Sequence, residues 1–146
     1  MQTLSDIELV EAAVPQTATF LEAAEELAAR PVPVIAVLDG ERAVVGLFGG
    51  EELLRGLFPP YLADLRHTAF AQDDLGILTE RARTVSGEPL EKHMVEPVTV
   101  DAATSALHVA ERFLHCGLAA IAVVEDGRFA GMLDRSDFCR AMLRAS

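Results

Sequence analysis

Two stretches of the sequence decide the fold: TATFLEAAEELAARPVPVIAV at Thr17–Val37 and ATSALHVAERFLHCGLAAIAV at Ala103–Val123. They align without a gap over 21 positions at a constant offset of 86, so that Ile35 aligns with Ile121. In each copy, apolar residues recur three and four positions apart, which predicts a helix with one buried face. A β-branched apolar run follows each helix and predicts a buried strand. The internal repeat therefore predicts two copies of one structural unit.

The unit extends beyond the quoted stretches. Thr19 and Ser105 are placed to cap the two helices, and an Asp-Gly pair after each buried strand predicts a hairpin. The predicted strands are Val34–Leu38, Ala43–Phe48, Val98–Val100, Ala120–Val124 and Arg128–Leu133, and the closing helices are Glu51–Phe58 and Ser136–Leu143. We therefore predict an α+β (alpha/beta) fold of two strand–helix–strand–strand–helix (βαββα) repeats, packed with pseudo-two-fold symmetry.

The predicted domain organisation is a first repeat over residues 5–58, a helical insertion over 59–92 and a second repeat over 93–144. The insertion is too long for a simple turn. Pro59 and Pro60 end the preceding helix. Asp73–Ser86 shows the spacing of an amphipathic helix that ends at Gly87.

Composition excludes several classes of protein. Of 146 residues 51% are hydrophobic, which indicates a folded chain. Twelve Lys and Arg against 23 Asp and Glu give a net charge of −11, which argues against nucleic-acid binding. No apolar run is long enough for a membrane span, and the N-terminal residues do not form a signal peptide. We expect a cytoplasmic protein without membrane insertion, in which Cys116 and Cys139 are small buried residues.

The two units resemble a tandem CBS-domain pair, the module named after cystathionine β-synthase. Members of that family close each unit with Gly–hydrophobic–hydrophobic–Ser/Thr–x–x–Asp, which opens the last helix. The second copy reads GMLDRSDF over Gly131–Phe138, with the signature glycine and Asp137 in place. The first copy reads GLFGGEEL over Gly46–Leu53, with Gly49 at the hydroxyl position and Glu52 at the acid position. The chain is thus similar to stand-alone bacterial CBS-pair proteins.

The resemblance implies an adenosine-containing ligand, such as AMP, ADP, ATP or S-adenosylmethionine, in the cleft between the units. The signature acid of the family accepts hydrogen bonds from the ribose hydroxyls, so Asp137 is the first candidate. The residues that the resemblance assigns to ligand binding in the second copy are Asp134, Arg135, Ser136, Asp137, Val98, Thr99, Leu118, Ala119 and Ala120. A weaker second site in the first copy consists of Glu52, Gly49 and Gly50.

Asp134 departs from the family signature. A carboxylate in place of the hydroxyl would repel a phosphate, which disfavours polyphosphate nucleotides and suits a neutral or cationic adenosyl ligand. For each of the two acids, Asp134 and Asp137, an interpretation without a ligand stays open. Asp134 would be only the N-cap of the last helix. Asp137 would be an acid near the helix N-terminus, where the helix dipole stabilises it by a few tenths to about 1 kcal/mol.

Nothing in the sequence predicts an enzyme. The four histidines lack the spacing of metal ligands, and no serine or cysteine lies in a recognisable nucleophile motif. We predict a non-catalytic regulatory module without catalytic residues or a metal site. An adenine nucleotide or S-adenosylmethionine would act as an effector rather than as a resident cofactor. The alternative is a ligand-independent protein-interaction scaffold with degenerate nucleotide sites. The resemblance also implies a homodimer, and a regulatory module implies a protein partner that it controls.

Overall fold

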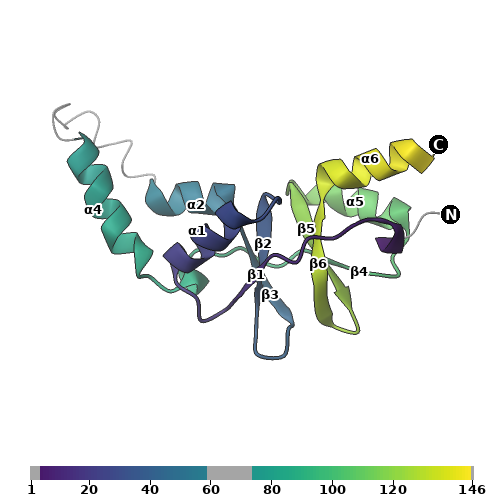
Figure 1. Cartoon of the computed structure of the whole chain (residues 1–146), viewed down its shortest axis with the longest axis horizontal. Helices are drawn as coiled ribbons and strands as arrows, with labels where there is room; N and C mark the ends of the chain where they lie inside the picture. The colour runs from purple at the N-terminus through teal and green to yellow at the C-terminus, as the bar shows by residue number, and fades with distance from the viewer. Residues whose placement is uncertain (1–3, 59–73, 146) are drawn as a thin grey trace.

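The computed structural model describes residues 4–58 and 74–145, which form two sheets of three strands (Figure 1). The first sheet has the order β1-β2-β3 and the second the order β4-β5-β6. In both, the central strand pairs parallel with the first strand and antiparallel with the third. One helix separates the parallel strands and another follows the third strand. This arrangement confirms the predicted α+β fold of two βαββα repeats.

The first repeat follows the predicted order of elements. Its elements are β1 (Ala13–Pro15), α1 (Phe20–Ala29), β2 (Val34–Leu38), β3 (Val44–Gly49) and α2 (Gly50–Leu57). Thr19 caps α1 as expected: its hydroxyl accepts the Glu22 N–H at 3.2 Å, and the Glu22 carboxylate accepts the Thr19 N–H at 2.8 Å. This reciprocal pair satisfies two backbone donors that the helix itself leaves unpaired.

The second repeat is built in the same way. Its elements are β4 (Thr99–Asp101), α5 (Ala106–Cys116), β5 (Ala120–Glu125), β6 (Arg128–Asp134) and α6 (Arg135–Ala145). Ser105 caps α5 by accepting the His108 N–H at 3.4 Å. Gly117 caps the end of this helix, and its φ of 69° is the left-handed conformation that glycine adopts without steric cost.

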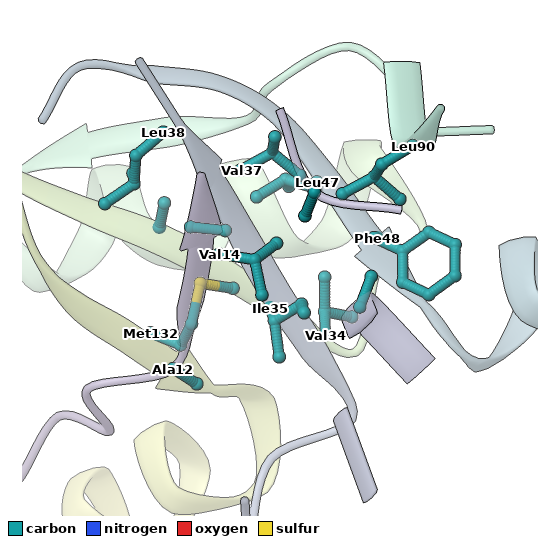
Figure 2. Close-up of a cluster of buried hydrophobic side chains, with 14 of the residues drawn as sticks. Ala12, Val14, Val34, Ile35, Val37, Leu38, Leu47, Phe48, Leu90 and Met132 are labelled. Atoms are coloured by element: carbon teal, nitrogen blue, oxygen red, sulfur yellow. The ribbon is translucent and has the colours of Figure 1, made fainter. Parts of the chain in front are cut away.

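The central strand β5 is buried on both of its faces. Ile121 and Val123 belong to a core cluster with Phe113 of α5 and Phe138 of α6. Ala120 and Ala122 alternate with them, and their side chains join the other core cluster, which lies mostly in the first repeat. Figure 2 shows this first cluster, where Met132 of β6 lies beside Ala12 and near Val14 of β1 and Ile35 of β2. The sheets of the two repeats therefore pack against one another through these buried side chains.

Each repeat is entered by a lead-in segment that pairs with the sheet of the other repeat. Val10, before β1, exchanges backbone hydrogen bonds with Met132 of β6 at 3.0 and 2.8 Å. Val95, before β4, exchanges hydrogen bonds with Leu47 of β3 at 3.0 and 2.9 Å. The short 3₁₀ helix η1 (Leu4–Asp6) accordingly lies beside the second repeat (Figure 1). The predicted boundaries 5–58, 59–92 and 93–144 follow the sequence repeat, whereas packing crosses them.

Arg42, in the turn between β2 and β3, links the two hairpins. Its carbonyl accepts the Phe129 N–H at 2.9 Å, and its guanidinium donates to the Phe129 carbonyl at 3.1 Å. The guanidinium also donates to Glu11 at 3.1 Å. Arg42 has a φ of 66°, a conformation that is uncommon for a residue with a side chain. These contacts between the repeats keep it in place.

The predicted helix of the insertion is present as α4 (Asp74–Ser86), and residues 59–73, including Pro59 and Pro60, lie outside the described chain. In Figure 1, α4 projects from the end of the first repeat, where it contacts α1 and α2. The Arg81 guanidinium donates to the Gly56 carbonyl at 2.9 Å. Val85 and then Leu90, in the 3₁₀ helix η3 (Leu90–Lys92), are fully buried in the first core. The described part of the insertion is therefore anchored on the first repeat.

The predicted burial of the cysteines is wrong. Cys139 is exposed on α6 and Cys116, the last residue of α5, is partly exposed. Apolar spacing alone did not reveal that α6 packs mainly through Phe138. Within the described ranges, no helix is long and apolar enough to cross a membrane.

We predict that the N-terminal lead-in stabilises the second repeat. Leu4 and Ile7 are 2% and 8% exposed and belong to the cluster of Phe113 and Phe138. Ile7→Ala should lower the free energy of unfolding by about 2–4 kcal/mol, because it leaves a cavity in that core. Urea denaturation measures the change. Leu107→Ala, at a residue that is 70% exposed on α5, is the matched control and should change stability by less than about 0.5 kcal/mol. Equal effects of the two variants would contradict this packing.

A second prediction concerns the ion pair between His93 and Glu88. A hydrogen bond from His93 at 2.8 Å is the main reason that the pKa of Glu88 lies below its usual value of 4.5; burial opposes this effect, and the charges of His93, Arg81 and Lys92 add to it. Because the folded pKa is lower than the unfolded one, this carboxylate stabilises the fold above pH 4.5, and the contribution is lost as the pH falls through the folded pKa.

The wild type should therefore lose more stability than Glu88→Gln between about pH 6 and pH 3. Denaturant titrations at several pH values in this range measure the difference. Parallel stability curves for the two proteins would show that Glu88 contributes nothing to the acid sensitivity of the fold.

Candidate functional site

A cavity of about 440 Å³ lies between the two repeats. We call it the inter-repeat cavity. Three segments line it: the end of α1 with the entry to β2, the first turn of α2, and the entry to β5. The lining residues are Leu27, Val32, Pro33, Val34, Gly49, Gly50, Glu51, Glu52, Gly117, Leu118 and Ala119. Its volume is within the range of about 300–1,000 Å³ that is typical of small-molecule sites.

The first turn of α2 supplies the polar wall of the cavity. Glu52 is the third residue of the helix, and its Oε1 accepts the Gly49 N–H at 2.9 Å. The side chain is thereby folded back over the start of the helix and is only 8% exposed. Glu52 is the only buried charged residue among those the structure describes. It lies at the acid position of the first signature, where the sequence places its weaker site.

Gly49 is needed beside Glu52 for a steric reason. A Cβ at this position would lie 2.9 Å from the Pro33 carbonyl oxygen and 3.1 Å from Cγ2 of Val34. It would also lie 3.4 Å from Oε1 of Glu52. The Pro33 carbonyl and the Val34 side chain therefore leave no room for a side chain at the hydroxyl position of the first signature.

The opposite wall belongs to the second repeat. Leu118 and Ala119 line the cavity, and their carbonyl groups face the start of α6. The Arg135 N–H donates to the Ala119 carbonyl at 2.9 Å, and the Arg135 guanidinium donates to the Leu118 carbonyl at 3.5 Å. The segment before β5 thus connects the cavity to the helix that carries the second signature.

The acids of the second signature both have partners in α6. Oδ1 of Asp134 accepts the Asp137 N–H at 3.0 Å, which is the hydrogen bond of a helix cap. The Asp137 carboxylate forms an ion pair with Arg140. Neither these residues nor Arg135 and Ser136 line any of the three cavities described for residues 4–58 and 74–145.

The remaining predicted residues are dispersed. Val98 lines a separate cavity of about 500 Å³ with Glu111, Arg112 and His115. The Thr99 carbonyl accepts a hydrogen bond from the Arg112 guanidinium at 3.1 Å. Ala120 is fully buried, with its methyl group in the first core. The structure thus combines Leu118 and Ala119 from the first predicted site with Gly49, Gly50 and Glu52 from the second.

Sequence reasoning missed the wall that comes from the first repeat. Val32, Pro33 and Val34 occupy the positions that correspond to Leu118, Ala119 and Ala120 at the offset of 86. Applying that offset to the second-copy residues would have identified them. Leu27, Glu51 and Gly117 were also not predicted, and no motif marks them. Among the described side chains, no group of three or more potential metal ligands occurs.

Comparisons with known proteins find the same fold in several solved structures. Residues 91–144 match the family model of the CBS domain, and none of the curated proteins matches the sequence. A CBS domain-containing protein of unknown function from Kribbella flavida aligns over 97% of this chain and 98% of its own, with 20% identity and a TM-score of 0.77.

Two further solved structures are similar over almost the whole chain. The CBS-pair protein CBSX2 from Arabidopsis thaliana has 21% identity and a TM-score of 0.74, covering 98% of this chain and 95% of its own. A CBS domain protein from Pyrobaculum aerophilum, complexed with AMP, has 21% identity and a TM-score of 0.72, covering 99% and 97%. The chain therefore has the fold of a CBS-domain pair, as the sequence resemblance implied.

The packing around Gly49 generates a prediction. Gly49→Ala should lower the free energy of unfolding by about 1–3 kcal/mol, because the added methyl group is too close to the Pro33 carbonyl. Gly50→Ala is the matched control: an added Cβ there has no atom within 4 Å, and alanine favours a helix by up to about 1 kcal/mol. Chemical denaturation of both variants tests the difference. If both substitutions stabilised the protein, the close contact at Gly49 would be refuted.

Proposed function

From the CBS-pair fold of the chain, we propose a non-catalytic regulatory module that binds an adenosyl ligand, of the AMP, ADP, ATP or S-adenosylmethionine class, between its repeats. The observation that carries the proposal is the inter-repeat cavity with the buried carboxylate of Glu52 in its wall. A similar structure, from Pyrobaculum aerophilum, was solved as a complex with AMP, which supports a nucleotide ligand for this fold.

The proposed site uses the two kinds of surface that an adenosyl group needs. A carboxylate has acceptor capacity for several donors, so Glu52 can accept a ribose hydroxyl while it caps α2. The apolar part of the lining, which includes Val32, Val34 and Leu118, suits the faces of an adenine ring. Hydroxyl recognition by Glu52 would orient the ligand, and apolar contact would contribute most of the affinity.

Regulation by a ligand is possible because the two repeats each supply part of the cavity wall. A ligand in the inter-repeat cavity contacts α2 of one repeat and the Leu118–Ala119 segment of the other. It can change the relative position of the repeats only to the extent that it binds one arrangement more tightly than another. Since Arg135 contacts the same segment, such a change would reach the start of α6.

The second signature stays a candidate site of its own. Asp137 would have to share its carboxylate between a ribose hydroxyl and Arg140, with Asp134, Arg135 and Ser136 beside it. Val98, Thr99, Leu118, Ala119 and Ala120 complete the site that the resemblance implies. Ala120 could take part only after a rearrangement, because its side chain is fully buried.

A second function is favoured by a different observation. Both acids of the second signature already have partners within α6, and the chain has a net charge of −11. A ligand-independent scaffold that docks a protein partner would have these properties. We propose that either kind of module acts as a homodimer.

Thermal unfolding with AMP, ADP, ATP, S-adenosylmethionine and adenosine distinguishes the two functions. A ligand at 100 times its Kd adds about 2.7 kcal/mol of stability, which raises the Tm by roughly 5–10 °C for a protein of this size. Glu52→Gln should reduce the shift if the ligand occupies the inter-repeat cavity, and Asp137→Asn should leave it unchanged. The reverse pattern would place the ligand at the second signature. No shift with any compound would favour the scaffold.

A further inference from the structure

We infer that the inter-repeat cavity selects an adenosyl compound with a positively charged centre, such as a sulfonium, over nucleotides that carry phosphate. This inference rests on the proposed function and adds the charge of the ligand to it. The inference is carried by the charged side chains of the cavity wall. They are negative, whereas a phosphate is bound by positive groups.

The charged side chains in the wall are all acidic. Glu51 and Glu52 lie side by side in the first turn of α2, and both line the cavity. Among the described residues that line it, none is Lys, Arg or His. Proteins bind phosphate by arginine, lysine and free backbone N–H groups, so the side chains of this wall supply no cation for it.

A ligand in the cavity lies next to these two carboxylates. Glu51 and Glu52 both line the cavity, so a charged group of a bound ligand lies close to them. Charges within about one Debye length of one another, roughly 8 Å at physiological ionic strength, are incompletely screened by salt. The carboxylate of Glu52 is itself buried, which strengthens its interaction with a neighbouring charge.

The start of α2 already has a carboxylate of its own. A helix N-terminus attracts anions through its dipole and its free N–H groups, and here the Glu52 side chain folds back over the first turn and accepts the Gly49 N–H. Arg55 pairs with Glu51 at 2.5 Å, and the Arg55 side chain is 67% exposed outside the cavity lining. Arg55 thus offsets the charge of Glu51, whereas no ion pair offsets that of Glu52 within the described chain.

Two matched pairs of ligands test the inference by isothermal titration calorimetry. Adenosine and AMP differ by the phosphate, and S-adenosylmethionine and S-adenosylhomocysteine differ by the sulfonium methyl group and its charge. We expect AMP to bind at least about tenfold more weakly than adenosine, and S-adenosylmethionine about tenfold more tightly than S-adenosylhomocysteine. Both ratios should shrink as the salt concentration rises from about 20 to 200 mM.

Variants assign the effect to the cavity. Glu52→Gln keeps a side-chain oxygen for the Gly49 N–H and should bring both ratios close to one. Glu51 is exposed, so Glu51→Gln should leave the fold intact. We expect this variant to reduce the two affinity ratios by a smaller factor than Glu52→Gln does. Glu41→Gln changes the net charge equally but lies in the β2–β3 turn, at the other end of β3, and should leave both ratios unchanged.

The outcomes separate this inference from the proposed function. If AMP binds more tightly than adenosine, or if Glu52→Gln and Glu41→Gln act alike, the charge selectivity is wrong while adenosyl binding stands. If none of the four compounds binds, the proposed function fails and the inference with it. If the ratios are as expected and Glu52→Gln removes them, Glu52 determines the ligand class.

Discussion

The central strand of each sheet is apolar on both faces, and one repeat has helices for only one of these faces. In β5, Ile121 and Val123 face the cluster of α5 and α6, which leaves Ala120 and Ala122 to be covered by the other repeat. Burying such a strand on both sides is what a fully apolar run requires. The packing of the two sheets against one another is therefore the condition on which the lead-in pairing, the Arg42 contacts and the cavity depend.

The inter-repeat cavity forms where this sheet packing ends. Its walls are the segments that enter β2 and β5 together with the first turn of α2, so each repeat supplies a part that the other lacks. At this position the two sheets fix the backbone. Some of the side chains that line the cavity are not needed for the packing of the sheets. In this chain one such side chain is that of Glu52, whose carboxylate accepts the Gly49 N–H.

The fold was predictable because two periodicities recur at one offset, which fixes helices and buried strands even where single patterns are ambiguous. Helix caps at Thr19 and Ser105 were predictable for the same reason. The crossing of the lead-in segments was not, since residues 4–10 carry no periodic signal and their partners are distant in sequence. Nor could the sequence show which signature adjoins a cavity. That depends on how Glu52 folds back over Gly49 and on the pairing of Asp137 with Arg140, both of which are local side-chain arrangements.

The exchange of lead-in segments links the order of synthesis to the order of folding. Leu4 and Ile7 are synthesised long before Phe113 and Phe138, with which they share a core. These two residues therefore lack that core until α6 has left the ribosome. Contacts between such distant residues slow folding, because a long loop has to close before they form. Residues 4–10 and α6 consequently complete the second core together, and neither repeat folds from its own half of the sequence alone.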